Sequence, residues 1–213
     1  YKSVHELVFD DEDVLWIGLG CFHCPGSGGL ARFDGETRQA FDTMNSDLPN
    51  DHVIGLAIDE QGTKWIGTTQ SLATFDGKTW TDLHAAEAST ALKSLEIPAI
   101  AFDPSGDVWV ASGGDGIARF DGDDWIYYSA EETPLPSDHA LDLLVDTEGV
   151  KWIGTDNGVA RLDDDGWTIY DASNSALRTN WIWTIAEDGS GNIWVGTNAG
   201  GLAAYREGGV LLP

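Results

Sequence analysis

Residues 59–77 read DEQGTKWIGTTQSLATFDG, and variants of this segment recur along the whole chain. In every copy the Trp is followed by Ile or Val and then by Gly or Ala, and an Asp stands six residues before it. The five copies are centred on Trp16, Trp65, Trp109, Trp152 and Trp194, at spacings of 49, 44, 43 and 42 residues. A period of this length is typical of folds in which each repeat is one supersecondary unit.

Each repeat divides into four short strands. The first is apolar, as in residues 53–58, and it leads into the turn formed by residues 59–62. Asp suits this turn because its carboxylate can accept from the backbone two residues further on, and Gly tolerates positive φ. The second strand carries the Trp, the third ends in Asp-Gly, which favours a tight hairpin, and the fourth is aromatic, as in residues 125–128.

Repeated four-stranded units of this length are typical of propellers. We therefore predict an all-β fold, a five-bladed β-propeller of four-stranded antiparallel blades, as a single domain over residues 1–213. The expected blades are residues 1–44, 45–90, 91–133, 134–175 and 176–213, each made of consecutive strands. The repeated Trp residues are expected in the core between sheets. A helix of about two turns is considered only for residues 85–93.

The net charge is −25, from 36 acidic and 11 basic residues. Such a field repels nucleic acid and anionic lipid, so neither is an expected partner. No stretch approaches the ~20 apolar residues that span a bilayer, so membrane insertion is not expected either. The expected partner is a small molecule or a protein, and we expect a monomer.

Residues 59–77 and 146–163, with the aromatic fourth strands, resemble the two-component regulator propeller repeat. The loops at residues 45–49 and 174–177 also resemble the inter-repeat loop of that family. Its members often form the extracytoplasmic, ligand-sensing region of bacterial histidine kinases, and ligands include glycan fragments. The resemblance implies a periplasmic, secreted or cell-surface location. Related propellers include the streptogramin lyases, which place a His and acids around a metal.

We aligned the repeats on the Asp that stands six residues before each Trp. In this alignment several polar and aromatic residues fall at the entry of the first strands. Seven residues before that Asp stand Ser3, His52, Glu96, His139 and Trp181, and two residues further on stand His5 and Trp183 among others. Equivalent positions of adjacent blades line one mouth of a propeller, so we predict a ligand-binding mouth there. The aromatic faces of Trp181 and Trp183 suit sugars or other flat ligands, although extra core packing is the alternative.

The same alignment raises the question of a metal. His52, Glu96 and His139 come from three consecutive repeats and could hold a divalent cation. The alternative is a solvated or hydrogen-bonded ring, and we expect no cofactor. No nucleophile elbow or phosphate loop is found, so no catalytic residue is assigned.

Cys21 and Cys24 are the only cysteines, and they lie in a loop that is six or seven residues longer than in the other repeats. We predict a disulfide between them, as in other extracytoplasmic proteins. A metal site with His23, redox chemistry or free thiols remain alternatives.

Taken with the missing catalytic signatures, these features favour a non-enzymatic binding or sensing module. Two alternatives stay open. One is a metal-dependent lyase or hydrolase of the propeller type, and the other is a structural or assembly protein at the cell surface.

Overall fold

The computed structural model describes residues 3–20, 28–83, 94, 96–206 and 209–211. It divides into two compact units, residues 1–100 and 101–213. The described residues contain strands and turns but no helix. The helix considered for residues 85–93 and the Cys21–Cys24 pair lie outside the described residues.

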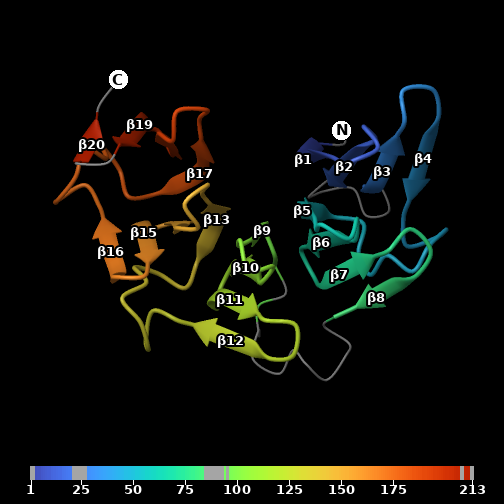
Figure 1. Cartoon of the computed structure of the whole chain (residues 1–213), viewed down its shortest axis with the longest axis horizontal. Helices are drawn as coiled ribbons and strands as arrows, with labels where there is room; N and C mark the ends of the chain where they lie inside the picture. Colours follow the sequence, from blue (N-terminus) through green and yellow to red (C-terminus); the bar gives the residue numbers. More distant parts are fainter. Residues whose placement is uncertain (1–2, 21–27, 84–93, 95, 207–208, 212–213) are drawn as a thin grey trace. The chain divides into compact units, whose positions relative to one another are not determined.

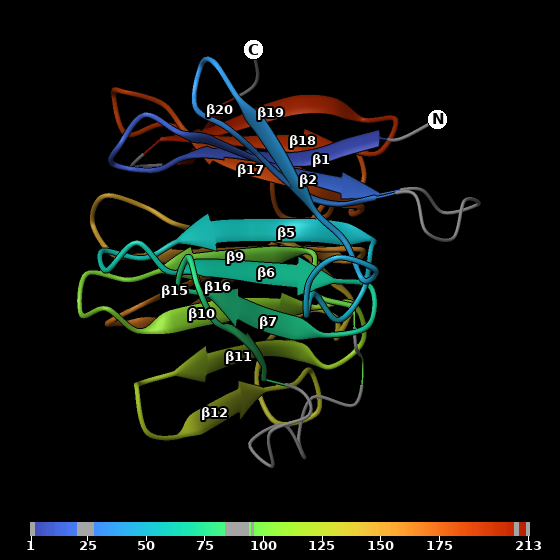
Figure 2. The same ribbon diagram turned by 90° about the vertical axis from the view of Figure 1, so that its right-hand side faces the viewer.

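The first unit holds two four-stranded antiparallel sheets, blades 1 and 2, with the strands in sequence order. Blade 1 consists of β1 (Ser3–Phe9), β2 (Leu15–Gly20), β3 (Gly29–Phe33) and β4 (Arg38–Phe41). Blade 2 consists of β5 (Val53–Ile58), β6 (Lys64–Thr68), β7 (Leu72–Phe75) and β8 (Trp80–Asp82). Figure 2 shows β5, β6 and β7 side by side.

The second unit holds blades 4 and 5 and most of blade 3, because the division between the units falls within β9. Blade 3 consists of β9 (Ala99–Phe102), β10 (Val108–Ser112), β11 (Gly116–Phe120) and β12 (Trp125–Tyr128). Blade 4 consists of β13 (Ala140–Val145), β14 (Lys151–Thr155), β15 (Gly158–Asp163) and β16 (Gly166–Tyr170). Blade 5 consists of β17 (Ile182–Glu187), β18 (Ile193–Thr197), β19 (Gly201–Arg206) and β20 (Gly209–Leu211).

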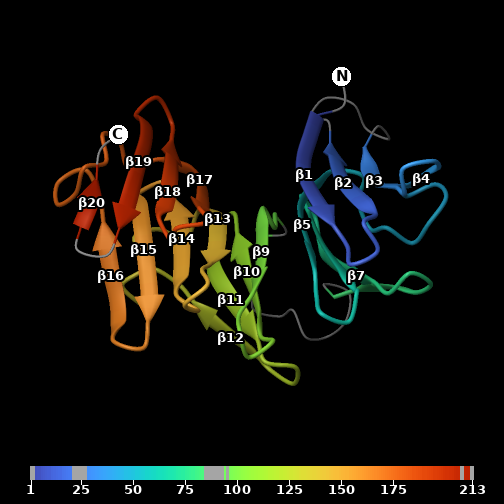
Figure 3. The same cartoon turned by 45° about the horizontal axis from the view of Figure 1, so that its top comes forward.

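Every sheet is built from four consecutive strands, which Figure 1 traces along the chain and Figure 3 shows for β13 to β16. The described residues thus form the five antiparallel, four-stranded blades of a β-propeller, and the predicted fold class is confirmed. Each blade begins with the apolar strand and continues with the Trp-bearing strand, as the repeat predicts.

The repeated Asp and Trp side chains are joined by a hydrogen bond in each described blade. The Asp carboxylate accepts the indole N–H of the Trp six residues later; the Nε1–Oδ2 distances are 2.8 Å for Trp16–Asp10, 2.9 Å for Trp65–Asp59, 3.0 Å for Trp109–Asp103, 2.8 Å for Trp152–Asp146 and 2.8 Å for Trp194–Asp188. The other carboxylate oxygen accepts backbone N–H groups of the turn, as with Glu148 and Val150 at Asp146. One side chain therefore closes the β-turn and orients the Trp.

Four of the repeated Trp residues, Trp16, Trp65, Trp109 and Trp152, are buried as predicted. Trp194 is only partly buried, which differs from the prediction. In the first unit, Trp16 packs with Leu56, Ile66 and Phe75 between blades 1 and 2. A corresponding cluster around Trp152 packs blade 4 against blade 5.

The first strands share an irregularity that the repeat pattern did not predict. The pairing of first and second strand shifts by one residue in four of the described blades, leaving His5, Ile54, Leu141 and Trp183 as the extra residues. A bulge of this kind bends the strand and redirects a side chain. His5 and Trp183, both predicted mouth residues, therefore stand at bulges.

Candidate functional site

In the second unit, His139 forms a polar pair with Asp156. His139 immediately precedes β13, and Asp156 lies in the turn between β14 and β15. Nδ1 of His139 is 3.3 Å from Oδ2 of Asp156, and the backbone N–H of Asp156 donates to the carbonyl oxygen of His139 over 3.3 Å. Both side chains are about one-third exposed, so the pair can contact a ligand.

Two tryptophan rings continue this surface on blade 5. Trp181 lies 6.3 Å from His139 between ring centroids, edge to face, and 5.9 Å from Trp183. The two indoles are 37% and 55% exposed, respectively, which identifies them as surface residues rather than additional core. Trp181 immediately precedes β17, and Trp183 is the extra residue of the bulge in that strand. We call these four residues, His139, Asp156, Trp181 and Trp183, the tryptophan surface.

In the first unit, the predicted mouth residues His5 and His52 are in direct contact. Their Nε2 atoms are 3.3 Å apart, although the residues come from different blades. Burial lowers the pKa of His5. Burial, followed by the neighbouring His5, lowers the pKa of His52, against an opposing effect of Glu96. Glu96 itself is exposed and immediately precedes the buried Ile97.

The predicted residues thus fall into two groups, His5 and His52 with Glu96 nearby, and His139 with Trp181 and Trp183. Within the part of the chain that the structure describes, no group of three or more His, Cys, Asp or Glu side chains is arranged to hold a metal ion. The sequence alignment did not identify Asp156 as a candidate site residue. It stands four residues after Trp152, where blade 1 has Gly20 and blade 5 has Asn198, so comparing this position across repeats could have found it.

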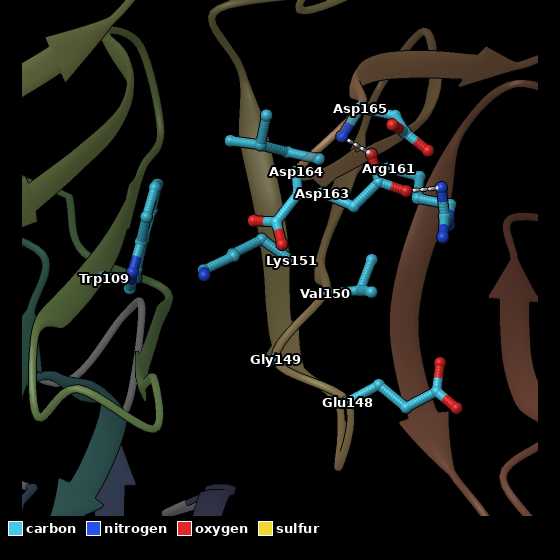
Figure 4. Close-up of a pocket in the computed structure, with 10 residues that line it drawn as sticks. Trp109, Glu148, Gly149, Val150, Lys151, Arg161, Asp163, Asp164 and Asp165 are labelled. Carbon is cyan, nitrogen blue, oxygen red and sulfur yellow. Dashed lines mark hydrogen bonds and ion pairs between the residues drawn. The ribbon is translucent and has the colours of Figure 1, made fainter.

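A separate cavity of about 410 Å³ lies at the other end of β14, around Lys151. Figure 4 shows Lys151 directed toward Trp109 and Asp163 beside Arg161. Both cations are already engaged, because Nζ of Lys151 is 3.3 Å from Oδ2 of Asp103 and Arg161 is paired with Asp163. Lys151 also lies 5.2 Å from the centroid of the Trp109 ring. These contacts give the cavity lining a structural role.

Asp142 is another carboxylate near the tryptophan surface, but its hydrogen bonds hold blades 4 and 5 together. Its Oδ2 accepts the backbone N–H of Ile185 over 2.6 Å, which ties blade 4 to blade 5, and its Oδ1 accepts from Leu143 over 2.8 Å. Burial raises the pKa of Asp142, and these hydrogen bonds oppose the shift. Removing this group should change stability, not ligand contacts.

Comparison with known proteins agrees with the repeat pattern. The family described as Two component regulator propeller matches residues 176–199, within the last repeat. This confirms the resemblance drawn from the repeats. No curated protein is similar to the chain in sequence.

Solved structures extend the likeness to the whole fold. The extracellular domain of a hybrid two component system from Bacteroides thetaiotaomicron is 22% identical with a TM-score of 0.82, over 97% of this chain and 28% of that one. PorZ, a surface component of the type-IX secretion system of Porphyromonas gingivalis, is 21% identical with a TM-score of 0.70, over 95% of this chain and 32% of that one. Virginiamycin B lyase from Staphylococcus aureus is 14% identical with a TM-score of 0.67, over 95% of this chain and 69% of that one.

At these identities the likeness concerns the fold. The chain spans less than a third of the length of the two component system and secretion structures. Within the described residues, no helix has the length and apolar character needed to cross a membrane.

Proposed function

We propose that this chain is a non-enzymatic binding module of an extracytoplasmic bacterial protein, and that it presents the tryptophan surface to a small ligand of the saccharide class. The observation that carries the proposal is the exposure of two adjacent indoles, Trp181 and Trp183, beside the polar pair of His139 and Asp156. Large aromatic side chains are usually buried, so two exposed neighbours need a reason.

The chemistry of the surface suits a saccharide. An indole face packs against the C–H face of a sugar ring, while a carboxylate and an imidazole at its edge can bond to hydroxyl groups. The net charge of −25 disfavours anionic ligands. A neutral sugar meets both conditions.

The proposed location rests on the structural neighbours. One of them is an extracellular domain of a bacterial two component system, which supports an extracytoplasmic sensing role. Because this chain spans 28% of that structure, the sensing role would belong to a larger protein, in which this propeller supplies the ligand contact.

A screen of the protein against an array of neutral and acidic saccharides tests the proposal. We expect binding to neutral members, at least tenfold weaker binding by the Trp181→Ala/Trp183→Ala variant, and an unchanged melting temperature. Ile126→Ala is the matched control, because Ile126 is 40% exposed on β12, away from the tryptophan surface. Binding that survives the double substitution would refute the assignment of the surface.

The metal-dependent lyase remains a second candidate because of the contact between His5 and His52 and the likeness in fold to virginiamycin B lyase. Incubating the protein with each bound saccharide, with and without a chelator, separates the two candidates. The binding module returns the ligand unchanged in both samples. Chelator-sensitive consumption of the ligand would favour the lyase.

A partner protein is the remaining alternative, consistent with the likeness in fold to PorZ, a surface component of a secretion system. A pull-down with the Trp181→Ala/Trp183→Ala variant as the comparison addresses it. Saturable capture of one protein by both forms, without saccharide binding, would favour assembly.

A further inference from the structure

The nitrogen–nitrogen distance of the histidine pair in the first unit fits two ligands of one metal ion. Nε2 of His5 and Nε2 of His52 are 3.3 Å apart, and the ring planes are inclined at 56°. Two imidazoles bound to one tetrahedral cation at about 2.0–2.1 Å hold their nitrogens about 3.3 Å apart. A hydrogen bond donated by nitrogen usually spans about 2.7–3.2 Å. The observed distance fits the metal geometry and also a long hydrogen bond between the two rings.

The backbone around the pair brings the two rings together. His5 is the extra residue of the bulge in β1, and His52 immediately precedes β5. Gly20, paired with Ser3 across the sheet, leaves the space that the rings occupy. A Cβ at Gly20 would lie 1.9 Å from Cδ2 of His52 and 2.8 Å from Nε2 of His5. At the corresponding position blade 3 also has a glycine, Gly113, whereas blades 2, 4 and 5 have Thr69, Asp156 and Asn198. The first repeat therefore differs from blades 2, 4 and 5 at the residue that makes room for the pair.

We propose that His5 and His52 bind a divalent transition-metal ion, with Zn²⁺ as the representative, through their Nε2 atoms. Imidazole suits Zn²⁺, Cu²⁺ and Ni²⁺. The described residues supply two side-chain ligands here and no third of the His, Cys, Asp or Glu type. Zinc sites that keep an open position use three protein ligands and one water, so two side chains leave two positions for water or an added ligand.

The surrounding charge favours a cation at this place. The carboxylate of Glu96 acts on His52, and the protein as a whole carries 25 net negative charges. The hydroxyl of Ser3 is 3.1 Å from Nε2 of His5 and also donates to the carbonyl oxygen of Gly20 over 3.0 Å. If His5 binds a metal, the Ser3 hydroxyl therefore keeps its hydrogen bond to the carbonyl oxygen of Gly20. The site is independent of the tryptophan surface and of any saccharide.

Calorimetric titration of Zn²⁺ into chelator-treated protein tests the proposal. The sample for this titration is prepared without a polyhistidine tag. It also contains the substitutions Cys21→Ser and Cys24→Ser, because the two thiols could bind Zn²⁺ by themselves. We expect one equivalent of Zn²⁺ to bind, with at least tenfold weaker binding in the His5→Ala and the His52→Ala variants. His139→Ala is the control and should bind as the parent does. Melting curves without metal establish that each variant is folded.

The ¹⁵N signals of the imidazoles provide a test that needs no substitution at the pair. Zn²⁺ should shift the Nε2 signals of His5 and His52 together and leave His139 unchanged. No saturable binding, equal binding by His5→Ala or His52→Ala, or shifts confined to other residues would overturn the proposal. Binding present only while Cys21 and Cys24 are intact would also overturn it.

Discussion

Oδ2 of Asp146 accepts a hydrogen bond of 2.8 Å from Nε1 of Trp152, and the equivalent pair occurs in each described blade. The same carboxylate accepts two backbone N–H groups of its turn. The spacing of six residues that defines the repeat is thus the spacing that lets one Asp hold both a turn and the core indole. This bond explains why Asp and Trp occur together along the chain.

A double-mutant cycle measures this bond. Asp146→Ala, Trp152→Phe and the combined variant are compared by urea unfolding. We expect a coupling free energy of about 1–3 kcal/mol, because a hydrogen bond to a charged acceptor is lost in each single variant. A coupling below about 0.5 kcal/mol would show that the two side chains act independently.

Substituting a buried and an exposed tryptophan should give opposite outcomes. Trp152 is 2% exposed, and Trp152→Ala should lower the free energy of unfolding by about 3–5 kcal/mol. Trp183 is 55% exposed, and Trp183→Ala should change it by less than about 1 kcal/mol. Urea unfolding of both variants is the measurement. Similar losses for the two variants would place Trp183 in the core.

Much of the fold could be predicted from the sequence because the repeat is structural. The Asp-Gly turns and the Trp-bearing strands fix four strands per repeat, and Asp was assigned to its turn correctly. Its second bond, to Trp152 in blade 4, could not be derived from turn chemistry alone. The bulges were missed because a shift of one residue leaves the apolar pattern of the first strand almost unchanged.

The candidate site was predicted in part. Alignment identified His52, His139 and Trp181 as equivalent, but it treats every blade alike. The contact between His5 and His52 depends on the bulge in β1, which blades 2, 4 and 5 share, and on the absence of a side chain at Gly20. The glycine is visible in the sequence, but which side chains fill the space beside it requires the structure.

Asp142 should make stability depend on pH. Burial raises its pKa in the folded protein above the unfolded value of about 3.9. Its favourable contribution is therefore complete below the unfolded pKa and is lost as pH rises through the folded pKa. In Asp142→Asn this titration is absent, so the stability of the variant relative to the parent should improve as pH rises from about 4.

Urea unfolding of both proteins between pH 4 and pH 8 measures this difference. The lost carboxylate contacts with Ile185 and Leu143 add an offset that does not depend on pH. A difference that stays constant over the range, or that changes in the other direction, would contradict the assignment.

Cys21 and Cys24 should form a disulfide in the native protein, a prediction that concerns residues outside those described. The ring they close is small, so the expected entropic stabilisation is modest. Mass spectrometry after alkylation, with and without reductant, measures the redox state. Two thiols alkylated without reductant would contradict the disulfide.

We infer that His139, Asp156, Trp181 and Trp183 form the ligand surface. It is tested most directly by following the indole N–H signals of the ten Trp residues while a saccharide selected on the array is added to ¹⁵N-labelled protein. We expect saturable shifts of the Trp181 and Trp183 signals, with those of Trp16, Trp109 and Trp152 unchanged. Saturation that shifts other indoles and leaves Trp181 and Trp183 in place would contradict it.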